Sequence, residues 1–244
     1  MLSPGDGKRP WHRRVMSTML DAVARRVAYR LADRLPDHDS ARRLVAVADS
    51  AEYAARYMQG AIATPDTDVV LFEGLKLASS DGLFAEFGVW RGSTINKIAE
   101  RVSECTTVHG FDSFEGLPQD WWGPYRKGLF DTKGGLPHVR ANVELHQGWF
   151  DATVPQFAAQ HPETPIAFLH VDCDLYSSTK TIFDCLGKRL RPGSIIVFDE
   201  YFNYPGWREH EYKAFQELVT AHSLRYRYVA YNTCEWNAAV QIIE

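Results

Sequence analysis

Acidic side chains follow two apolar runs of the sequence. Asp172 and Asp174 come directly after an almost wholly apolar run, and Asp199 and Glu200 follow another. The carboxyl ends of neighbouring parallel strands meet at one edge of a sheet, so these carboxylates would repel one another there unless a cation lay among them. Carboxylate oxygens suit a hard ion such as Mg²⁺, and no Cys/His cluster at zinc spacing competes. We therefore expect Asp172, Asp199 and Glu200 as magnesium ligands and Asp174 as a structural residue.

Structural roles are the alternative for these acidic residues. One or two of them would then cap the next helix near Ser177, or pair with Lys180 and Arg208. His170 and His210 stand alone in the sequence. We expect both histidines to be structural rather than general bases.

A glycine turn follows an earlier apolar run. Leu83–Phe87 contains Glu86 and leads into Gly88 and Gly92, after which apolar residues recur at helical spacing. Strand, tight turn and helix in this order form the place where open α/β sheets bind nucleotide-like ligands. Glycine lets the backbone turn sharply beside a ligand, and the N–H groups at the start of the helix favour negative charge.

The residues around this turn indicate the kind of ligand. Trp90 stands where the dinucleotide fingerprint has its second glycine, which disfavours a flat pyrophosphate and suits an amino-acid carboxylate and ammonium. Asp112 ends the next strand and would accept hydrogen bonds from two ribose hydroxyls, the alternative being a turn aspartate that caps Glu115-Gly116. Gly148-Trp149 would leave a flat slot for an adenine ring, unless Trp149 is a core aromatic.

The composition excludes several classes of protein. The chain has 244 residues, of which 45% are hydrophobic and 24% charged, and a net charge of −4 gives no reason to expect a nucleic-acid partner. No run approaches the roughly 20 apolar residues that a membrane span needs. The four cysteines are far apart and form no C-x-x-C pair. We expect a cytoplasmic protein with reduced thiols and without nucleic-acid or membrane partners.

The chain divides at about residue 60. Residues 1–60 are expected to form a disordered tail and a helical arm, with helices over 15–35 and 44–58. The first of these helices is basic and amphipathic, and we expect it to pack on its own domain or on a second subunit, the alternative being a membrane surface. We therefore expect a homo-oligomer.

Residues 61–244 alternate between strand and helix patterns and predict one α/β sheet of parallel strands with one reversed C-terminal strand. The short link over 232–236 allows only an antiparallel final pair. The expected strands are 83–87, 107–111, 143–146, 165–171, 194–198, 225–231 and 238–243, and the expected helices are 64–77, 93–102, 152–159, 177–186 and 209–218.

Residues 113–140 form a long insertion without clear periodicity. The segment contains Trp121, Trp122, Tyr125 and Phe130 among glycines and prolines. It is too long for a mere connection and too aromatic for a disordered linker. We expect a lid or a substrate wall, the alternative being a surface excursion packed on the core.

Several motifs, taken in order, resemble the macrocin O-methyltransferase family. The resemblance covers about residues 60–244, and the family usually has Asp-Asp where this chain has Asp199-Glu200. It implies a Rossmann-like class I methyltransferase sheet and an enzyme that uses S-adenosyl-L-methionine and Mg²⁺ to methylate sugar hydroxyls of macrolides and related natural products. The motifs are Glu86-Phe-Gly-Val, Phe111-Asp-Ser-Phe-Glu-Gly-Leu-Pro118, Gly148-Trp-Phe, His170-Val-Asp-Cys-Asp-Leu-Tyr-Ser-Ser-Thr179 and Ile196-Val-Phe-Asp199-Glu200-Tyr201.

The resemblance also implies roles for individual residues. The cofactor would be held along the glycine turn and the metal at the later strand ends, where Asp172 would also take the proton of the acceptor hydroxyl. The implied cofactor contacts are Glu86 and Gly88 for the methionine part, Ser93 and Thr94 for its carboxylate, and Asp112 with Ser113 for the ribose; the implied metal ligands are Asp172, Asp199 and Glu200.

Other functions stay open at this point. A nicotinamide-dependent oxidoreductase would use Asp112 in the same way, and a methyltransferase could act on a catechol-like hydroxyl instead of a sugar. A non-catalytic scaffold with a decayed site is a third class. The acceptor of a sugar methyltransferase would be a free sugar, a nucleotide sugar or a glycosylated antibiotic.

Overall fold

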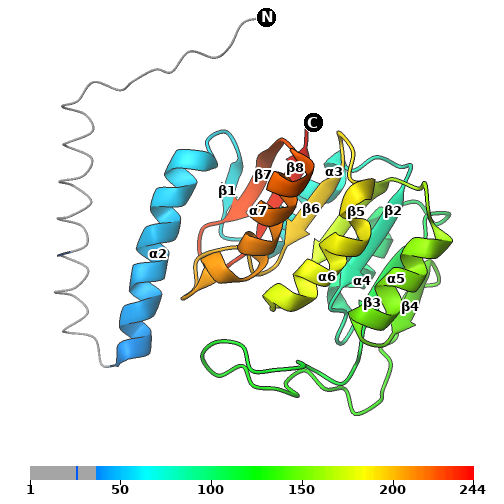
Figure 1. Ribbon diagram of the computed structural model, residues 1–244, viewed down its shortest axis with the longest axis horizontal. Helices are drawn as coiled ribbons and strands as arrows, with labels where there is room; N and C mark the ends of the chain where they lie inside the picture. Colours follow the sequence, from blue (N-terminus) through cyan, green and yellow to red (C-terminus); the bar gives the residue numbers. More distant parts are fainter. Residues whose placement is uncertain (1–25, 27–36) are drawn as a thin grey trace, which may run out of the picture.

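The computed structural model describes Arg26 and residues 37–244, and in these residues eight strands form one sheet in the order β1-β7-β8-β6-β5-β2-β3-β4 (Figure 1). All neighbouring strands are parallel except β8, which runs antiparallel to β6 and β7. The expected α/β sheet with one reversed C-terminal strand is confirmed. The strands are β1 Ile62–Thr64, β2 Leu83–Phe87, β3 Val108–Asp112, β4 Val143–Gln147, β5 Ile166–Val171, β6 Ile195–Phe198, β7 Tyr226–Asn232 and β8 Ala238–Ile242.

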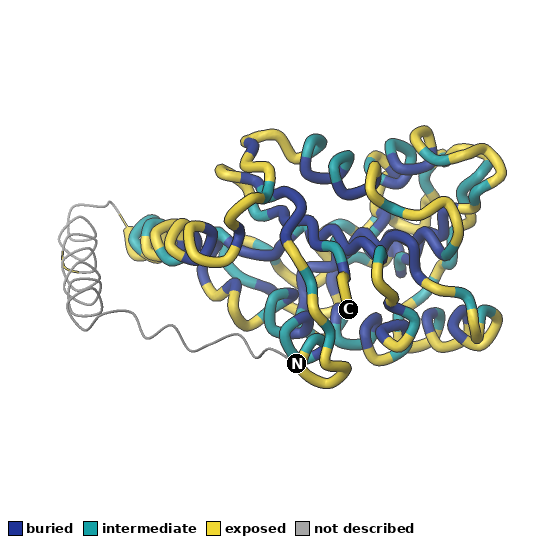
Figure 2. The backbone as a smooth tube through the Cα atoms, turned by 90° about the horizontal axis from the view of Figure 1, so that it is seen from above, coloured by how far each residue is buried: buried dark blue, intermediate teal, exposed yellow. Residues whose placement is uncertain are grey.

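Helices cover both faces of this sheet and bury it in two apolar clusters. One cluster joins α5, α6 and α7 to one face, and the other joins α3 and α4 to the opposite face. Figure 2 shows the buried strands between helices whose outer turns are exposed. Every residue of β5 is buried, as expected for a parallel strand covered on both sides. The helices are α2 His38–Tyr57, α3 Thr67–Leu77, α4 Ser93–Arg101, α5 Phe150–Gln160, α6 Tyr176–Leu186 and α7 Glu211–His222, with short 3₁₀ turns η1 Gly187–Arg189 and η2 Trp207–Glu209.

The sequence patterns missed one strand and placed the others closely. β1 pairs with the end of β7 over only three residues, Ile62 lying opposite Ala230. The sequence Thr64-Pro65-Asp66 indicates a helix start. The short strand directly before it was therefore not predicted. The helix expected over 15–35 lies outside the described residues apart from Arg26, and so does the expected disordered tail. In the described part of the chain, no helix is long and apolar enough to cross a membrane.

Helix α2, the described part of the expected arm, is docked on the segment that follows β6. The Asp49 carboxylate accepts hydrogen bonds from the Trp207 indole at 3.1 Å and from the Arg208 guanidinium at 3.0 Å. The Tyr53 hydroxyl lies 2.6 Å from the hydroxyl of Tyr228. Because Asp199 and Glu200 begin that segment, α2 supports the strand end at which these carboxylates stand.

Gly88 allows two strand ends to approach each other. Its φ is 97°, and a Cβ at this position would fall on the carbonyl oxygen of Asp172. The Asp172 amide donates to the Phe87 carbonyl at 2.9 Å, and the Gly88 amide donates to the Phe111 carbonyl at 2.9 Å. The glycine therefore leaves room for the backbone of Asp172. The sequence analysis expected it only to let the chain turn sharply beside a ligand.

The substitution Gly88→Ala is expected to lower the free energy of unfolding by roughly 3 kcal/mol or more, because a left-handed backbone and a steric clash act together. The matched control is Gly193→Ala, which has φ 101° and no atom within 4 Å of its Cβ. The control should lose only the conformational part, about 1–2 kcal/mol. Urea unfolding followed by tryptophan fluorescence compares the two; equal losses would show that the approach to Asp172 is not restrictive.

Candidate active site

A cavity of about 680 Å³ opens where β2, β3, β5 and β6 end. This is the edge at which open α/β sheets bind their ligands. Of the residues expected to hold the cofactor or the metal, all but Gly148 line the cavity. The selected residues that line it are Glu86, Gly88, Trp90, Ser93, Thr94, Asp112, Ser113, Trp149, Asp172, Asp199 and Glu200.

Asp112 fastens the glycine turn to the end of β3. One carboxylate oxygen accepts the amides of Val89 at 2.8 Å and Trp90 at 2.7 Å, and the other accepts the amide of Phe114 at 2.7 Å. A carboxylate has about four acceptor sites, so about one remains for a hydroxyl in the cavity. The sequence analysis expected a ribose contact or, as the alternative, a turn aspartate that caps Glu115-Gly116, and neither expectation included the bonds to Val89 and Trp90.

The first turn of α4 faces the cavity through Ser93 and Thr94. Its N-cap is Gly92, and no side chain caps the helix. The N–H groups of a first turn lack partners inside the helix and carry partial positive charge. This end of the cavity therefore suits a carboxylate.

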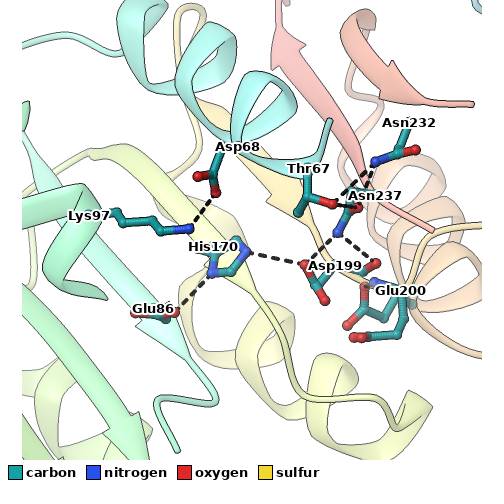
Figure 3. Close-up of polar contacts among 10 residues, drawn as sticks. Thr67, Asp68, Glu86, Lys97, His170, Asp199, Glu200, Asn232 and Asn237 are labelled. Atoms are coloured by element: carbon teal, nitrogen blue, oxygen red, sulfur yellow. Dashed lines mark hydrogen bonds and ion pairs between the residues drawn. The ribbon is translucent and has the colours of Figure 1, made fainter. Parts of the chain in front are cut away.

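A buried ion pair links the glycine turn to the acidic strand ends. Glu86, which is 1% exposed, meets Nδ1 of His170 at 3.1 Å through one oxygen, and Nε2 of His170 lies 3.9 Å from Asp199 (Figure 3). Burial raises the pKa of Glu86 against the opposing effect of His170. The same burial disfavours a charged His170, but the hydrogen bond and charge of Glu86 outweigh it and raise the pKa of His170. The second oxygen of Glu86 is buried without a partner.

Three carboxylates converge on the other side of the cavity. One oxygen each from Asp172, Asp199 and Glu200 lies within 4.8 Å of the others, and one oxygen of Glu200 is buried without a partner. Burial, followed by the charge of Asp199, raises the pKa of Asp172 and of Glu200 well above the usual range. The same two causes raise the pKa of Asp174 to about 7. A cation among these oxygens would relieve the repulsion. Carboxylate oxygens are the ligands that Mg²⁺ prefers, so the cluster has the donor atoms of a magnesium site.

The two structural roles considered for these carboxylates, capping the helix near Ser177 and pairing with Lys180 or Arg208, are wrong. Lys180 pairs with Asp184, and Arg208 pairs with Asp49. No side chain caps the start of α6. Neither basic residue pairs with a strand-end carboxylate, and no strand-end carboxylate caps the start of α6.

Two polar residues of the site had no sequence signal. Glu211, the first residue of α7, is fully buried; one of its oxygens accepts the Glu200 amide at 3.1 Å and the other has no partner. Asn237, just before β8, donates to the Asp199 carbonyl oxygen at 3.2 Å and to the Asp199 side chain (Figure 3). Only the fold brings them there, because Glu211 is 11 residues from Glu200 along the chain and Asn237 is 38 residues from Asp199.

The insertion over 113–140 both packs on the core and lines the cavity. The Trp121 ring lies 5.4 Å from that of Tyr204, and the Trp122 ring stacks on Tyr204 at 5.6 Å. Tyr125 and Phe130 line the cavity, where Trp236 joins them. The two expectations for this segment are thus combined, since two tryptophans anchor it and the next aromatic residues form a wall. Whether it moves as a lid stays a prediction.

Trp149 is 38% exposed and lines the cavity, so the alternative of a core aromatic is wrong. Gly148 lies behind it, with its amide donating to the Asp112 carbonyl oxygen at 2.9 Å. His210 packs edge-on to Trp121 with ring centres 5.9 Å apart.

Known proteins with similar sequences are methyltransferases. Residues 85–201 match the family model described as a methyltransferase domain. The 8-demethyl-8-(2,3-dimethoxy-alpha-L-rhamnosyl)-tetracenomycin-C 4'-O-methyltransferase of Streptomyces olivaceus is 32% identical over 49% of this chain and 53% of its own length. The demethyldecarbamoylnovobiocin O-methyltransferase of Streptomyces niveus is 29% identical over 57% of this chain and 62% of its own length. The match thus spans about half to three fifths of these two relatives.

A solved structure with a similar fold is the calicheamicin methyltransferase CalS11. It superposes with a TM-score of 0.56 and 26% identity, covering 71% of this chain and 76% of its own. The expected class I methyltransferase fold and the resemblance to O-methyltransferases of natural products are confirmed. None of these matches supports the oxidoreductase or the catechol alternative.

The substitution Asp112→Asn is expected to lower the free energy of unfolding by about 2 kcal/mol, because its amide nitrogen would face a backbone N–H where a charged oxygen now accepts one. The control Asp131→Asn, at an exposed carboxylate that accepts the Lys133 amide at 2.6 Å, should change it by less than about 0.5 kcal/mol. Urea unfolding at pH 7 compares the variants. Equal, small effects would mean that Asp112 does not hold the turn.

Proposed function

We propose that this chain, whose residues 85–201 match a methyltransferase domain, is an S-adenosyl-L-methionine-dependent O-methyltransferase that uses Mg²⁺. Its acceptor would be a hydroxyl of a sugar, either free, nucleotide-linked or part of a glycosylated natural product. The similar proteins are named as O-methyltransferases of tetracenomycin and novobiocin compounds. The single observation that carries the proposal is one cavity with an unpartnered buried oxygen of Glu86 at one side and three convergent carboxylates at the other.

The glycine-turn side of the cavity fits the cofactor. The ammonium of its methionine part would satisfy the free oxygen of Glu86, and its carboxylate would meet the uncapped first turn of α4 at Ser93 and Thr94. The ribose would use the remaining acceptor capacity of Asp112, and the exposed ring of Trp149 would pack on the adenine.

The carboxylate side fits a hard divalent ion. Asp172, Asp199 and Glu200 would hold it, as the unpartnered oxygen of Glu200 and the mutual repulsion of the three groups suggest. Bound there, Mg²⁺ would lower the pKa of an acceptor hydroxyl.

The acceptor would lie between the carboxylates and the aromatic wall. Tyr125, Phe130 and Trp236 present flat apolar surfaces on which a sugar ring can pack. Asp172 would take the proton of the acceptor hydroxyl. Because the sulfonium methyl is already activated, the work left to the protein is to orient the hydroxyl and to accept its proton.

Three further expectations stay predictions: the cytoplasmic location, the homo-oligomeric state and the division at residue 60 into an arm and a methyltransferase domain.

The test is methyl transfer from labelled S-adenosyl-L-methionine to a panel of nucleotide sugars and glycosylated polyketides. With an accepted substrate, EDTA should abolish turnover, and Asp199→Asn should lower it by at least about a hundredfold, because one ligand charge is lost. The control Asp184→Asn removes an exposed carboxylate of α6 that is paired with Lys180, and it should keep turnover within about threefold of wild type. Full turnover in the presence of EDTA, or full turnover by Asp199→Asn, would contradict the proposed metal site. If no sugar in the panel accepted the methyl group, the proposed acceptor class would be wrong.

A further inference from the structure

Two histidines and a glutamate meet away from the cavity, on the outer strands of the sheet. In the parallel register of β3 and β4, His109 lies opposite Glu144, and Phe111 lies opposite His146. Side chains two residues apart on a strand share a face, so both histidines and the glutamate project to the same side. One donor atom from each lies within 4.8 Å of the other two. None of the three lines the cavity described above.

The distances among these atoms are close to those of a shared metal ion. Nδ1 of His109 lies 3.1 Å from Nε2 of His146, and the Glu144 oxygens lie 3.8 Å and 4.0 Å from these nitrogens. Two nitrogens bound to a tetrahedral zinc at about 2.0–2.1 Å are about 3.3 Å apart. The imidazoles thus already have a chelating separation, and a small rotation of the exposed Glu144 would complete three ligands.

Aromatic neighbours hold the two rings. His146 stacks on Phe111 with ring centres 4.4 Å apart and planes at 12°, and His109 packs against Phe157 of α5 at 4.7 Å. Burial, then the neighbouring His146, lowers the pKa of His109 to about 4. Burial also lowers the pKa of His146. Lowered pKa values favour the neutral imidazole, which is the form that binds metals.

A solvent path to the group exists through Glu144, whose side chain is 61% exposed. In the absence of a metal, one imidazole would donate an N–H to the lone pair of the other, and the Glu144 carboxylate would take no part in that hydrogen bond. A metal ion would engage all three groups. Imidazole with a single carboxylate suits zinc better than magnesium, which prefers an all-oxygen shell.

We propose that His109, Glu144 and His146 form a second metal site that takes Zn²⁺ or a similar borderline transition ion, with a fourth position left to water. The ion would tie β4, the last strand at this edge of the sheet, to β3. Since β3 ends at Asp112, which holds the glycine turn, this tie would stabilise the wall of the cavity from behind. The inference does not rest on the proposed methyl transfer.

The test uses Co²⁺ as a spectroscopic substitute for zinc, added to the full chain at saturating Mg²⁺ so that the three strand-end carboxylates of the cavity are occupied. Wild type should bind one Co²⁺ with the intense visible absorption of a four-coordinate ion, and Zn²⁺ should abolish that absorption. Glu144→Gln changes an exposed side chain and keeps both imidazole rings. Both Glu144→Gln and His146→Gln should weaken Co²⁺ binding at least about a hundredfold, because loss of even an outer-shell partner lowers metal affinity about 10–100-fold. His222→Gln, at the exposed end of α7, is the matched control and should behave as wild type.

Thermal unfolding supplies a second readout. At saturating Mg²⁺, Zn²⁺ should raise the Tm of wild type and of His222→Gln with increasing concentration, and the same rise in Glu144→Gln should need about a hundredfold more Zn²⁺. Circular dichroism of the metal-free proteins shows whether each variant is folded. Absence of the visible band in wild type, or an equal band and an equal Tm rise in Glu144→Gln, would overturn the proposal.

Discussion

Crowding of like charge at one edge of the sheet is the constraint on which the rest of the structure depends. Burial and mutual repulsion both disfavour ionised carboxylates, and within residues 37–244 no lysine or arginine forms an ion pair with any of them. His170 lies between two members of the group, and Asn237 donates to Asp199. Protonation relieves part of this cost, as the raised pKa values of Asp172 and Glu200 indicate, and a bound cation would relieve it as well. The crowded carboxylates are Glu86, Asp172, Asp174, Asp199, Glu200 and Glu211.

The same edge is built so that its backbone cannot relax away from that crowding. Gly88 lets the turn after β2 lie against the backbone of Asp172, and Asp112 ties the same turn to the end of β3. On the other side, α2 braces the segment after β6 through Asp49 and its two partners. The candidate ligands for cofactor and metal thus stand on strand ends that are fixed to one another, which is the rigidity that positioning chemistry requires.

Local sequence patterns were sufficient for the framework and for most of the cavity. Apolar runs that end in acidic residues predicted both the parallel strands and the convergence of Asp172, Asp199 and Glu200, because every parallel strand ends at the same edge. What the sequence could not supply depends on register and on distant segments. Glu211 and Asn237 reach Asp199 and Glu200 only through α7 and the reversed strand, and His109 meets His146 only through the pairing of β3 with β4. The spacing of these two histidines along the chain resembles no zinc motif, so the sequence analysis saw none.

In the proposed function, the cavity binds S-adenosyl-L-methionine and Glu86 is the partner of its ammonium group. The test is a calorimetric titration that compares two ligands on the wild-type chain. One ligand is S-adenosylhomocysteine, and the other is its deaminated form, which lacks the ammonium group. We expect micromolar binding of the first ligand and binding at least about tenfold weaker of the second, because a buried charge-assisted contact is worth more than about 1.4 kcal/mol. Equal affinities would contradict the role of Glu86, and no binding of either ligand would contradict the assignment of the cavity.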